Sequence, residues 1–238
     1  MDKIAIVPAY NEEKALPAVL RALRADAPDF DVVVVNDGST DGTSAAARSV
    51  PGVWVIDLPE NIGIGGAVQT GFIYARDGGY GLAVQVDGDG QHVPAEIAKI
   101  AAPVLAGTAD AAIGSRFLGK PGEAAFKGSP FRRAGIRVFQ GLNALLLGER
   151  ITDSTSGFRA FNRRAIEVLS VTYPDDYPEP EAVYILRKRG LRIVEVPVAM
   201  AGRAAGRSSI TFWHSLYYMV KVCLAIFVLL LRREDRVD

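Results

Sequence analysis

The feature that most limits the fold of this chain is an alternation of short apolar runs with amphipathic stretches through its first half. Five runs rich in Val, Ile and Ala have the length of strands, at residues 4–7, 32–35, 53–56, 82–86 and 109–113. The stretch 13–25, after the first run, has leucine at helical spacing. Strands separated by helices are typical of a mostly parallel sheet with helices on both faces. We therefore predict an open α/β layer.

Three polar loops directly follow predicted strands. They read PAYNE at 8–12, NDGS at 36–39 and DGDGQ at 87–91. In open α/β sheets, ligands bind beyond the carboxyl ends of the strands. We therefore expect the three loops to lie together at one edge of the sheet and to form the functional site.

The last of these loops predicts a metal site. A buried strand delivers Asp87 and Asp89 into a glycine-flanked turn, and Gln91 offers a further oxygen. A set of oxygen ligands suits a hard ion such as Mg²⁺ or Mn²⁺, which commonly bridges to substrate phosphates. A turn that only joins a strand to a helix is the structural alternative. The presence of Asp37 at the end of another predicted strand favours the metal site.

Asp37 is a candidate for holding a nucleoside. It ends the second apolar run, and its carboxylate is expected to accept a hydrogen bond from a nucleobase or a ribose hydroxyl. The same segment also fits a purely structural role. In that interpretation, residues 36–39 shape the turn and Asp41 caps the next helix.

The second half of the chain is less regular. Gly and Pro are frequent in 118–131, which predicts a mobile loop before a helix at 132–147. The other predicted elements are an irregular segment, a helix and a strand, at 172–180, 181–189 and 191–198. No independent second domain is apparent before residue 210, so we expect residues 1–209 to form one domain.

Composition excludes several classes of protein. The single cysteine, Cys223, can form no intrachain disulfide, and the two histidines, His92 and His214, have no spaced partner for a zinc site. The N-terminus lacks the charged-then-apolar layout of a signal peptide. These features favour a reducing compartment and predict a cytoplasmic protein.

The C-terminal segment 210–238 differs from the rest of the chain. Residues 210–231 begin aromatic and end aliphatic, but only 222–231 is free of polar residues, which gives a helix of about 15 Å, half the hydrocarbon thickness of a bilayer. Residues 185–233 contain nine basic residues against one acidic residue, Glu195, which favours an anionic membrane surface over nucleic acid. We predict a helix peripheral on the inner face of the membrane. A homo-oligomer interface, a core helix and a solvated basic face are the alternatives. A small membrane protein that extends the short helix is a further candidate partner.

Seven motifs resemble those of family 2 glycosyltransferases and occur in the same order. They are PAYNEE, VVNDGSTDGT, NIGIGGA, VQVDGDGQ, GSRF, TSGFRAF and EVPV. Within that family, the chain is similar to the dolichyl- or polyprenyl-phosphate sugar synthase branch over about residues 3–209. The resemblance implies a GT-A fold, a nucleotide-diphosphate sugar donor, a divalent metal and an inverting transfer of a hexosyl unit to a lipid phosphate.

The resemblance also implies roles for individual residues. The nucleotide-holding loops of the branch match Pro8, Tyr10, Glu12, Asp37 and Gly65, and its metal and diphosphate site matches Asp87, Asp89 and Gln91. Arg116 matches a phosphate-contacting arginine, and Arg203 matches an arginine that closes over the donor diphosphate. The remaining matches are basic residues near the acceptor phosphate and an active-site acid, at Arg132, Arg133 and Glu181.

One departure from the branch affects the predicted acceptor site. Many members have Gly-x-Ser-Lys where this chain reads GRSS at 206–209. Arg207 is the available substitute for the missing lysine, although its register differs.

The predicted residues suit the chemistry of sugar transfer. The departing phosphate gains negative charge, which a metal held by Asp89 and cations such as Arg116 stabilise. A phosphate acceptor, with a second pKa of about 6, is already nucleophilic at pH 7. Glu181 is therefore expected to orient the acceptor more than to deprotonate it.

Three other functions remain open. Extension of a saccharide on a hydroxyl acceptor would require Glu181 to act as a base. A sugar nucleotidyltransferase also uses an α/β sheet and Mg²⁺, but the glycine- and arginine-rich N-terminal loop of such enzymes is replaced here by residues 8–12. A non-catalytic binding subunit is disfavoured because the acidic residues of the loops and Arg116 are retained together.

Overall fold

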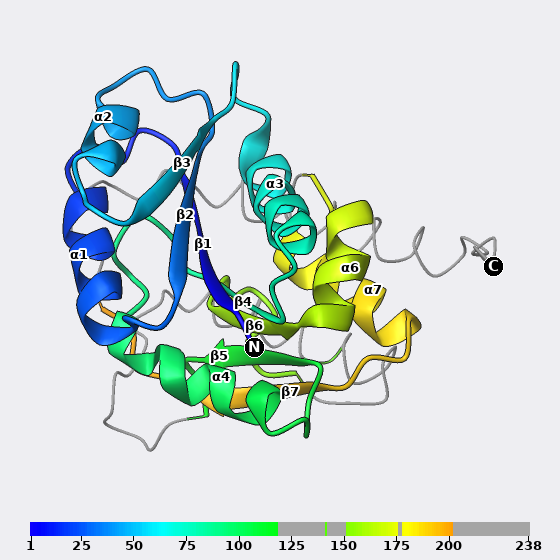
Figure 1. Cartoon of the computed structure of the whole chain (residues 1–238). Helices are drawn as coiled ribbons and strands as arrows, with labels where there is room; N and C mark the ends of the chain where they lie inside the picture. Colours follow the sequence, from blue (N-terminus) through cyan, green and yellow to red (C-terminus); the bar gives the residue numbers. More distant parts are fainter. Residues whose placement is uncertain (119–140, 142–150, 176–177, 202–238) are drawn as a thin grey trace.

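The computed structural model describes residues 1–118, 141, 151–175 and 178–201 of the 238-residue chain. Its strands form one seven-stranded sheet in the order β3-β2-β1-β4-β6-β5-β7 (Figure 1). The strands are β1 (Lys3–Ala9), β2 (Asp31–Asn36), β3 (Val53–Asp57), β4 (Leu82–Gln85), β5 (Ala111–Ser115), β6 (Arg159–Asn162) and β7 (Ile193–Pro197). The helices are α1 (Leu16–Asp26), α2 (Thr43–Arg48), α3 (Gly63–Asp77), the 3₁₀ turn η1 (Pro94–Glu96), α4 (Ile97–Leu105), α6 (Arg163–Val171) and α7 (Pro178–Lys188).

The sheet is mostly parallel, which confirms the predicted fold class. β1 lies between β2 and β4 and is parallel to both, and β3 extends the parallel part beyond β2. β6 is inserted between β4 and β5 and runs antiparallel to each of them. β7 completes the sheet parallel to β5. The insertion of β6 was not predicted, because a four-residue strand, RAFN, is too short to show a periodic pattern.

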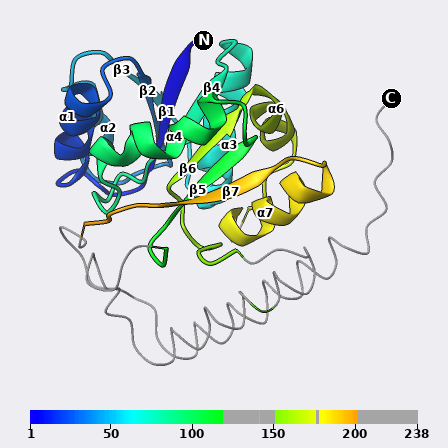
Figure 2. The same ribbon diagram turned by 90° about the horizontal axis from the view of Figure 1, so that it is seen from below.

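Two hydrophobic layers cover the sheet. Alternate residues of each strand point to opposite faces. Val32 and Val34 therefore belong to the hydrophobic cluster that includes residues of α1, α2 and α4, whereas Val33 belongs to the cluster that includes residues of α3, α6 and α7. Figure 1 shows the two groups of helices on either side of the sheet, and Figure 2 shows α7 beside β7. Both faces of the central strands are therefore buried, as the continuous apolar runs predicted.

Several boundaries differ from the prediction for identifiable reasons. The strand expected at 109–113 runs from Ala111 to Ser115. Asp110, just before it, is held by its side chain, which accepts hydrogen bonds from the Arg192 backbone N–H (2.8 Å) and from Asn162 Nδ2 (2.8 Å). The helix expected at 181–189 begins earlier, at Pro178, since proline suits the first turn of a helix. α6 was not predicted, and the Asn162 side chain caps its start by accepting from the Ala165 N–H (3.0 Å).

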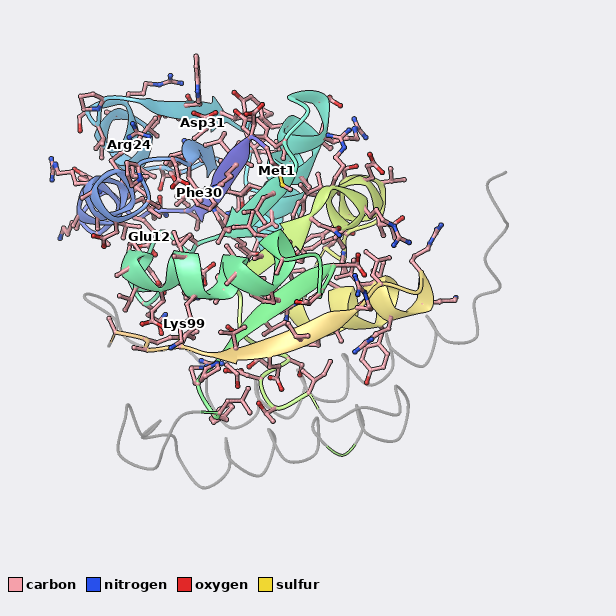
Figure 3. The ribbon with its side chains drawn as sticks, turned by 60° about the horizontal axis from the view of Figure 1, so that its bottom comes forward. Met1, Glu12, Arg24, Phe30, Asp31 and Lys99 are labelled. Atoms are coloured by element: carbon pink, nitrogen blue, oxygen red, sulfur yellow. The ribbon has the colours of Figure 1, made fainter. Side chains whose placement is uncertain are left out.

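A side-chain hydrogen bond spans the connection between α1 and β2. Arg24 of α1 donates to the carbonyl of Phe30, 3.1 Å away, just before β2 begins, and the Phe30 ring is buried (Figure 3). This contact joins the end of α1 to the start of the strand that carries Asp37 beyond its carboxyl end.

Some predictions fall outside the described residues. The loop and helix expected at 118–147 lie there almost entirely, as do Arg132, Arg133, Arg203, Arg207 and the C-terminal helix expected within 210–238. Among the residues that the structure describes, no helix is both long and apolar enough to cross a bilayer.

Candidate active site

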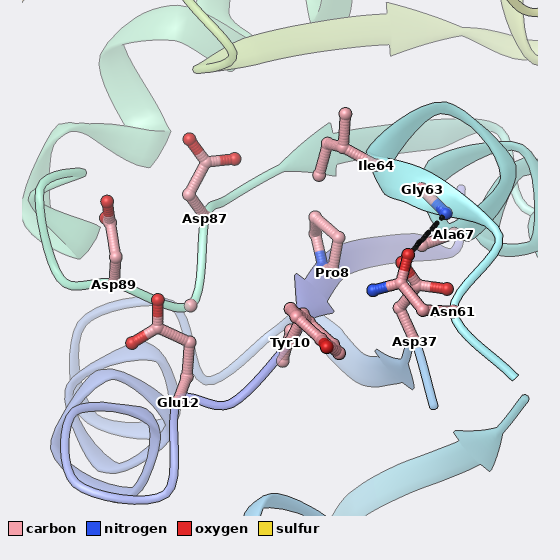
Figure 4. Close-up of a pocket in the computed structure, with 12 residues that line it drawn as sticks. Pro8, Tyr10, Glu12, Asp37, Asn61, Gly63, Ile64, Ala67, Asp87 and Asp89 are labelled. Atoms are coloured by element: carbon pink, nitrogen blue, oxygen red, sulfur yellow. Dashed lines mark hydrogen bonds between the residues drawn. The ribbon is translucent and has the colours of Figure 1, made fainter. Parts of the chain in front are cut away.

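A cavity of about 340 Å³ lies beyond the carboxyl ends of β1, β2 and β4, at the edge where the three polar loops were expected to meet (Figure 4). Acidic side chains come from all three loops, and the N-terminal turns of α3 complete the wall. The lining residues are Pro8, Ala9, Tyr10, Glu12, Asp37, Asn61, Gly63, Ile64, Ala67, Asp87, Gly88 and Asp89. The structure therefore brings the predicted residues of the first, second and fourth strands into one site.

The first two loops are joined by reciprocal hydrogen bonds. The Asn11 side chain accepts from the Thr40 N–H (2.9 Å), and the Asn11 N–H donates to Ser39 Oγ (3.0 Å). The Glu12 N–H donates to Thr43 Oγ1 (2.8 Å) at the start of α2. Asp41 accepts from the Thr43 N–H (2.9 Å), which agrees with a structural role for that carboxylate. These bonds hold Glu12 at the cavity, while Tyr10 stays 46% exposed.

Asp37 is a fixed part of the cavity wall. It is buried, and its two carboxylate oxygens accept from the N–H groups of Ile62 (2.8 Å) and Gly63 (3.1 Å) at the start of α3. Each carboxylate oxygen can accept more than one hydrogen bond. Asp37 therefore keeps the capacity to accept from a ligand while its position is set by α3.

Gly65 has a different surrounding from the one expected for a residue that holds a nucleotide. It does not line the cavity; its N–H donates to the carbonyl of Asp175 (3.2 Å). An added Cβ atom would lie only 2.1 Å from the Pro174 carbonyl oxygen. Glycine at this position thus allows α3 to pack closely against the segment that precedes α7.

The turn after β4 presents two carboxylates. Asp87 and Asp89 both line the cavity, and Asp89 is buried apart from 8% of its surface. Asp89 Oδ1 accepts from the Gln91 N–H (3.0 Å), and the Gln91 side-chain amide donates to Asp89 Oδ2. Gln91 therefore contacts the second carboxylate through its amide nitrogen.

The residues at this turn fit a magnesium or manganese ion. Within the described ranges, no group of three or more His, Cys, Asp or Glu side chains forms a complete metal cage. Two carboxylates in an open cavity match the usual binding of these ions through one or two protein carboxylates, water and substrate phosphates. Space around Asp87 is preserved by Gly157, because a Cβ atom there would lie 3.2 Å from each Asp87 carboxylate oxygen.

Arg116 lies at the carboxyl end of β5 and is held by a residue that sequence reasoning missed. Its Nε and Nη2 donate to Asp153 Oδ2 and Oδ1, each at 2.7 Å. Burial lowers the pKa of Arg116, whereas the hydrogen bonds and the charge of Asp153 raise it, and the charge of Asp87 raises it further. The net shift of the pKa is upward. The guanidinium is therefore a fixed cation in the electrostatic field of the Asp87 carboxylate.

The motifs TSGFR and EVPV together build the loop that carries Asp153. Arg159 is almost fully buried and donates to the carbonyls of Ser154 and Ser156, each at 2.7 Å. Glu195 of β7 accepts from the backbone N–H groups of Thr152 (2.7 Å) and Asp153 (2.8 Å). The spacing between the two motifs was the available signal, and in the structure Glu195 of the second motif contacts the residues just before the first.

Two acidic residues occupy the first turn of α7. Glu181, the predicted active-site acid, is partly buried there. Glu179, which the sequence did not single out, has its pKa raised by burial; the charge of Arg159 opposes this shift and the charge of Asp87 adds to it. Glu179 therefore lies close enough to Asp87, in the turn after β4, for the negative charge of Asp87 to act on it.

The open sheet and the acidic cavity at its strand ends define a GT-A glycosyltransferase, an enzyme that uses a nucleotide sugar. The chain belongs to glycosyl transferase family 2, whose sequence profile matches residues 4–170. This finding confirms the family indicated by the motifs.

Relatives within this family carry lipid-phosphate names. The chain is 32% identical over 217 residues to polyprenol monophosphomannose synthase of Mycolicibacterium smegmatis, covering 87% of this chain and 80% of the relative. It is 33% identical over 218 residues to undecaprenyl-phosphate mannosyltransferase of Micrococcus luteus, covering 89% and 88%. It is 35% identical over 212 residues to UDP-N-acetylglucosamine–dolichyl-phosphate N-acetylglucosaminyltransferase of Methanococcus voltae, covering 81% and 83%.

Solved structures support the fold. Glucosyl-3-phosphoglycerate synthase of Mycobacterium tuberculosis, crystallised with Mn²⁺, UDP-glucose and phosphoglyceric acid, superposes with a TM-score of 0.73 at 20% identity, covering 98% of this chain and 81% of that one. Mannosyl-3-phosphoglycerate synthase of Rubrobacter xylanophilus superposes with a TM-score of 0.74 at 18% identity, covering 100% and 77%. At these identities the likeness concerns the fold.

Proposed function

We propose that this enzyme transfers a hexosyl unit from a nucleotide-diphosphate sugar to a polyprenyl phosphate, such as undecaprenyl or dolichyl phosphate, with inversion at the anomeric carbon. The observation that carries this proposal is the 32–35% identity, over at least four fifths of the chain, to three relatives whose names specify lipid-phosphate sugar transfer. The cavity supports it because its carboxylates and fixed loops suit a nucleotide diphosphate.

The donor nucleotide occupies the cavity in this proposal. Asp37, held by α3, accepts a hydrogen bond from the nucleoside, and Pro8, Tyr10 and Glu12 hold it from the first loop. Mg²⁺ or Mn²⁺, bound by Asp87 and Asp89 with Gln91 beside them, would supply charge stabilisation for the departing diphosphate. A fold neighbour crystallised with Mn²⁺ and UDP-glucose is consistent with this assignment.

The charge that develops on the leaving group is met by Arg116. Because Asp153 fixes the guanidinium in a bidentate pair, little reorganisation is needed when the glycosidic bond breaks. Arg203 is assigned to closure over the diphosphate, on its match to the branch.

The acceptor is proposed to attack without a strong base. A lipid phosphate is largely ionised at pH 7, so Glu181 in the first turn of α7 orients the acceptor. Arg132, Arg133 and Arg207 are assigned to the acceptor phosphate on their positions in the motifs. Such an acceptor requires access to a membrane surface, which agrees with a domain at 1–209 followed by a membrane-associated segment at 210–238 on the cytoplasmic face.

The decisive experiment is transfer of a labelled sugar into an organic-extractable product. The full chain is incubated with undecaprenyl phosphate, Mn²⁺ or Mg²⁺, and a panel of UDP-, GDP- and TDP-sugars. We expect product from one donor, and loss of that product with EDTA. Donor binding without a lipid product would favour a saccharide hydroxyl acceptor, and absence of both binding and transfer would contradict the proposal.

The membrane assignment has its own test. Flotation of the full chain with vesicles that contain anionic lipid is compared with flotation of a chain that ends at residue 209. We expect the shorter chain to lose vesicle binding. Equal flotation of the two chains would contradict a membrane role for residues 210–238.

A further inference from the structure

The imidazole of His92 lies directly behind the acidic turn and is not part of the cavity wall. It is 4% exposed, and its Nδ1 accepts from the Asp87 N–H at 2.9 Å. Its Nε2 lies 3.5 Å from Asp87 Oδ2. One side chain therefore contacts both the backbone and the carboxylate of a predicted metal ligand.

These contacts define which ring nitrogen carries the proton. Because Nδ1 accepts a hydrogen bond from a backbone N–H, the proton of the neutral ring resides on Nε2. The Nε2 atom that carries this proton lies 3.5 Å from Asp87 Oδ2, a separation at which the N–H dipole and the carboxylate charge interact. The ring thus favours one orientation of the carboxylate.

The ring is itself held by two parts of the chain that are distant in sequence. It stacks on the buried Phe158 ring, with centroids 4.8 Å apart and planes inclined by 13°. On another side, His92 pairs with Met200 in an antiparallel bridge, and the Ala201 N–H donates to the Gln91 carbonyl at 2.9 Å. The TSGFR loop and the strand extension after β7 therefore both fix the turn that ends in His92.

We propose that His92 is a positioning residue, which holds the Asp87 carboxylate in the orientation that binds the divalent metal together with the donor diphosphate. This inference rests on the proposed function, since it concerns the same metal site. Gly88 and Gly90 make the turn intrinsically flexible, so a preformed carboxylate orientation requires an external partner. Outer contacts of this kind commonly change metal affinity by about 10- to 100-fold when they are removed.

Three variants separate hydrogen bonding from ring packing. His92→Phe keeps a ring that can stack on Phe158 but cannot accept from the Asp87 N–H. His92→Asn loses the ring but offers an amide oxygen near the position of Nδ1, and His92→Ala has neither feature. Phe161→Leu is the control for loss of core packing, because Phe161 is buried on the α3 face of the sheet and touches Phe72 there.

The measurement is the dissociation constant of Mn²⁺ for the full chain with UDP or GDP present, by calorimetry or by the spin resonance of free Mn²⁺. We expect His92→Phe and His92→Ala to weaken Mn²⁺ binding about tenfold or more, His92→Asn to stay closer to the unsubstituted protein, and Phe161→Leu to leave the constant unchanged. Thermal unfolding of each variant shows which of them are folded.

The possible results distinguish the inference from the proposed function. Equal Mn²⁺ constants for the unsubstituted protein and a folded His92→Phe variant would overturn the inference alone. If His92→Phe does not fold, equal constants for His92→Asn and His92→Ala would overturn it. An unsubstituted protein that binds no Mn²⁺ with either nucleotide would overturn the metal site of the proposed function, and the positioning role with it.

Discussion

Arg116 and Asp153, 37 positions apart in sequence, form a bidentate ion pair at the edge of the candidate active site, with both N–O distances at 2.7 Å. The Asp153 side chain is fully buried, and that of Arg116 is 18% exposed. The Arg116 backbone N–H also donates to Asp153 Oδ2 at 3.0 Å. The position of the Arg116 guanidinium thus depends on the loop that leads into the TSGFR motif.

Asp153→Asn is expected to destabilise the fold by about 3 kcal/mol, because removal of one charge from a buried pair leaves the other uncompensated. Urea unfolding measures this change. Glu167→Gln, in the exposed pair with Arg163, is the matched control and should change stability by less than about 0.5 kcal/mol. If the two substitutions had equal effects, the pair would not be acting as a buried one.

Gly157→Ala is expected to weaken Mn²⁺ binding about tenfold, since the added methyl group would crowd both oxygens of Asp87 at 3.2 Å. Mn²⁺ binding with a nucleoside diphosphate present gives the readout. Gly141→Ala is the control, because a Cβ atom there meets no atom within 4 Å. Unchanged Mn²⁺ affinity in Gly157→Ala would show that the space beside Asp87 is not needed for the metal.

Glu195→Gln should lower both stability and sugar transfer. An amide nitrogen cannot accept hydrogen bonds, so one of the N–H groups of Thr152 and Asp153 would lose its partner, at a cost of about 1–3 kcal/mol. Unfolding free energy and turnover are measured on the same preparation. Glu96→Gln, in an exposed pair with Lys99, serves for comparison and should affect neither quantity. Normal turnover in Glu195→Gln would argue against a role of this loop in placing Arg116.

Glu179 predicts a pH dependence of stability. Burial raises its folded-state pKa above the ordinary value of 4.5, so its contribution is most favourable below about pH 4.5 and is lost as pH rises through the folded-state pKa. Glu179→Gln removes this titration. The variant should therefore gain stability relative to the unsubstituted protein as pH increases from 4 to 8, in urea unfolding without divalent metal. A constant difference across that range would contradict the raised pKa.

Local patterns in the sequence were sufficient for the parallel part of the sheet. The apolar runs near residues 4–7 and 32–35 correspond to β1 and β2, because strands buried on both faces carry almost no polar residue. The carboxyl ends of parallel strands meet at one edge, so Asp37 and Asp87 were predicted to share a site, and both line the cavity. The motifs added the family, which the comparisons confirm.

The order of the remaining strands was decided by long-range pairing. β6 lies between β4 and β5 although β5 precedes it by more than forty residues, and its four residues show no period from which this position follows. The start of α7 shifted for a local reason, because proline suits the first turn of a helix and this turn begins before the apolar periodicity, at Pro178.

The amino-acid sequence by itself determined which loops carry the chemistry, because residue type and strand ends are local properties. Only the tertiary structure decided which residues support them. Asp153 reaches Arg116, Glu195 holds the Asp153 loop and His92 holds Asp87 against Phe158. Most of these partners are separated by tens of residues, and a hydrogen bond between such residues forms only after the sheet has brought their strands together.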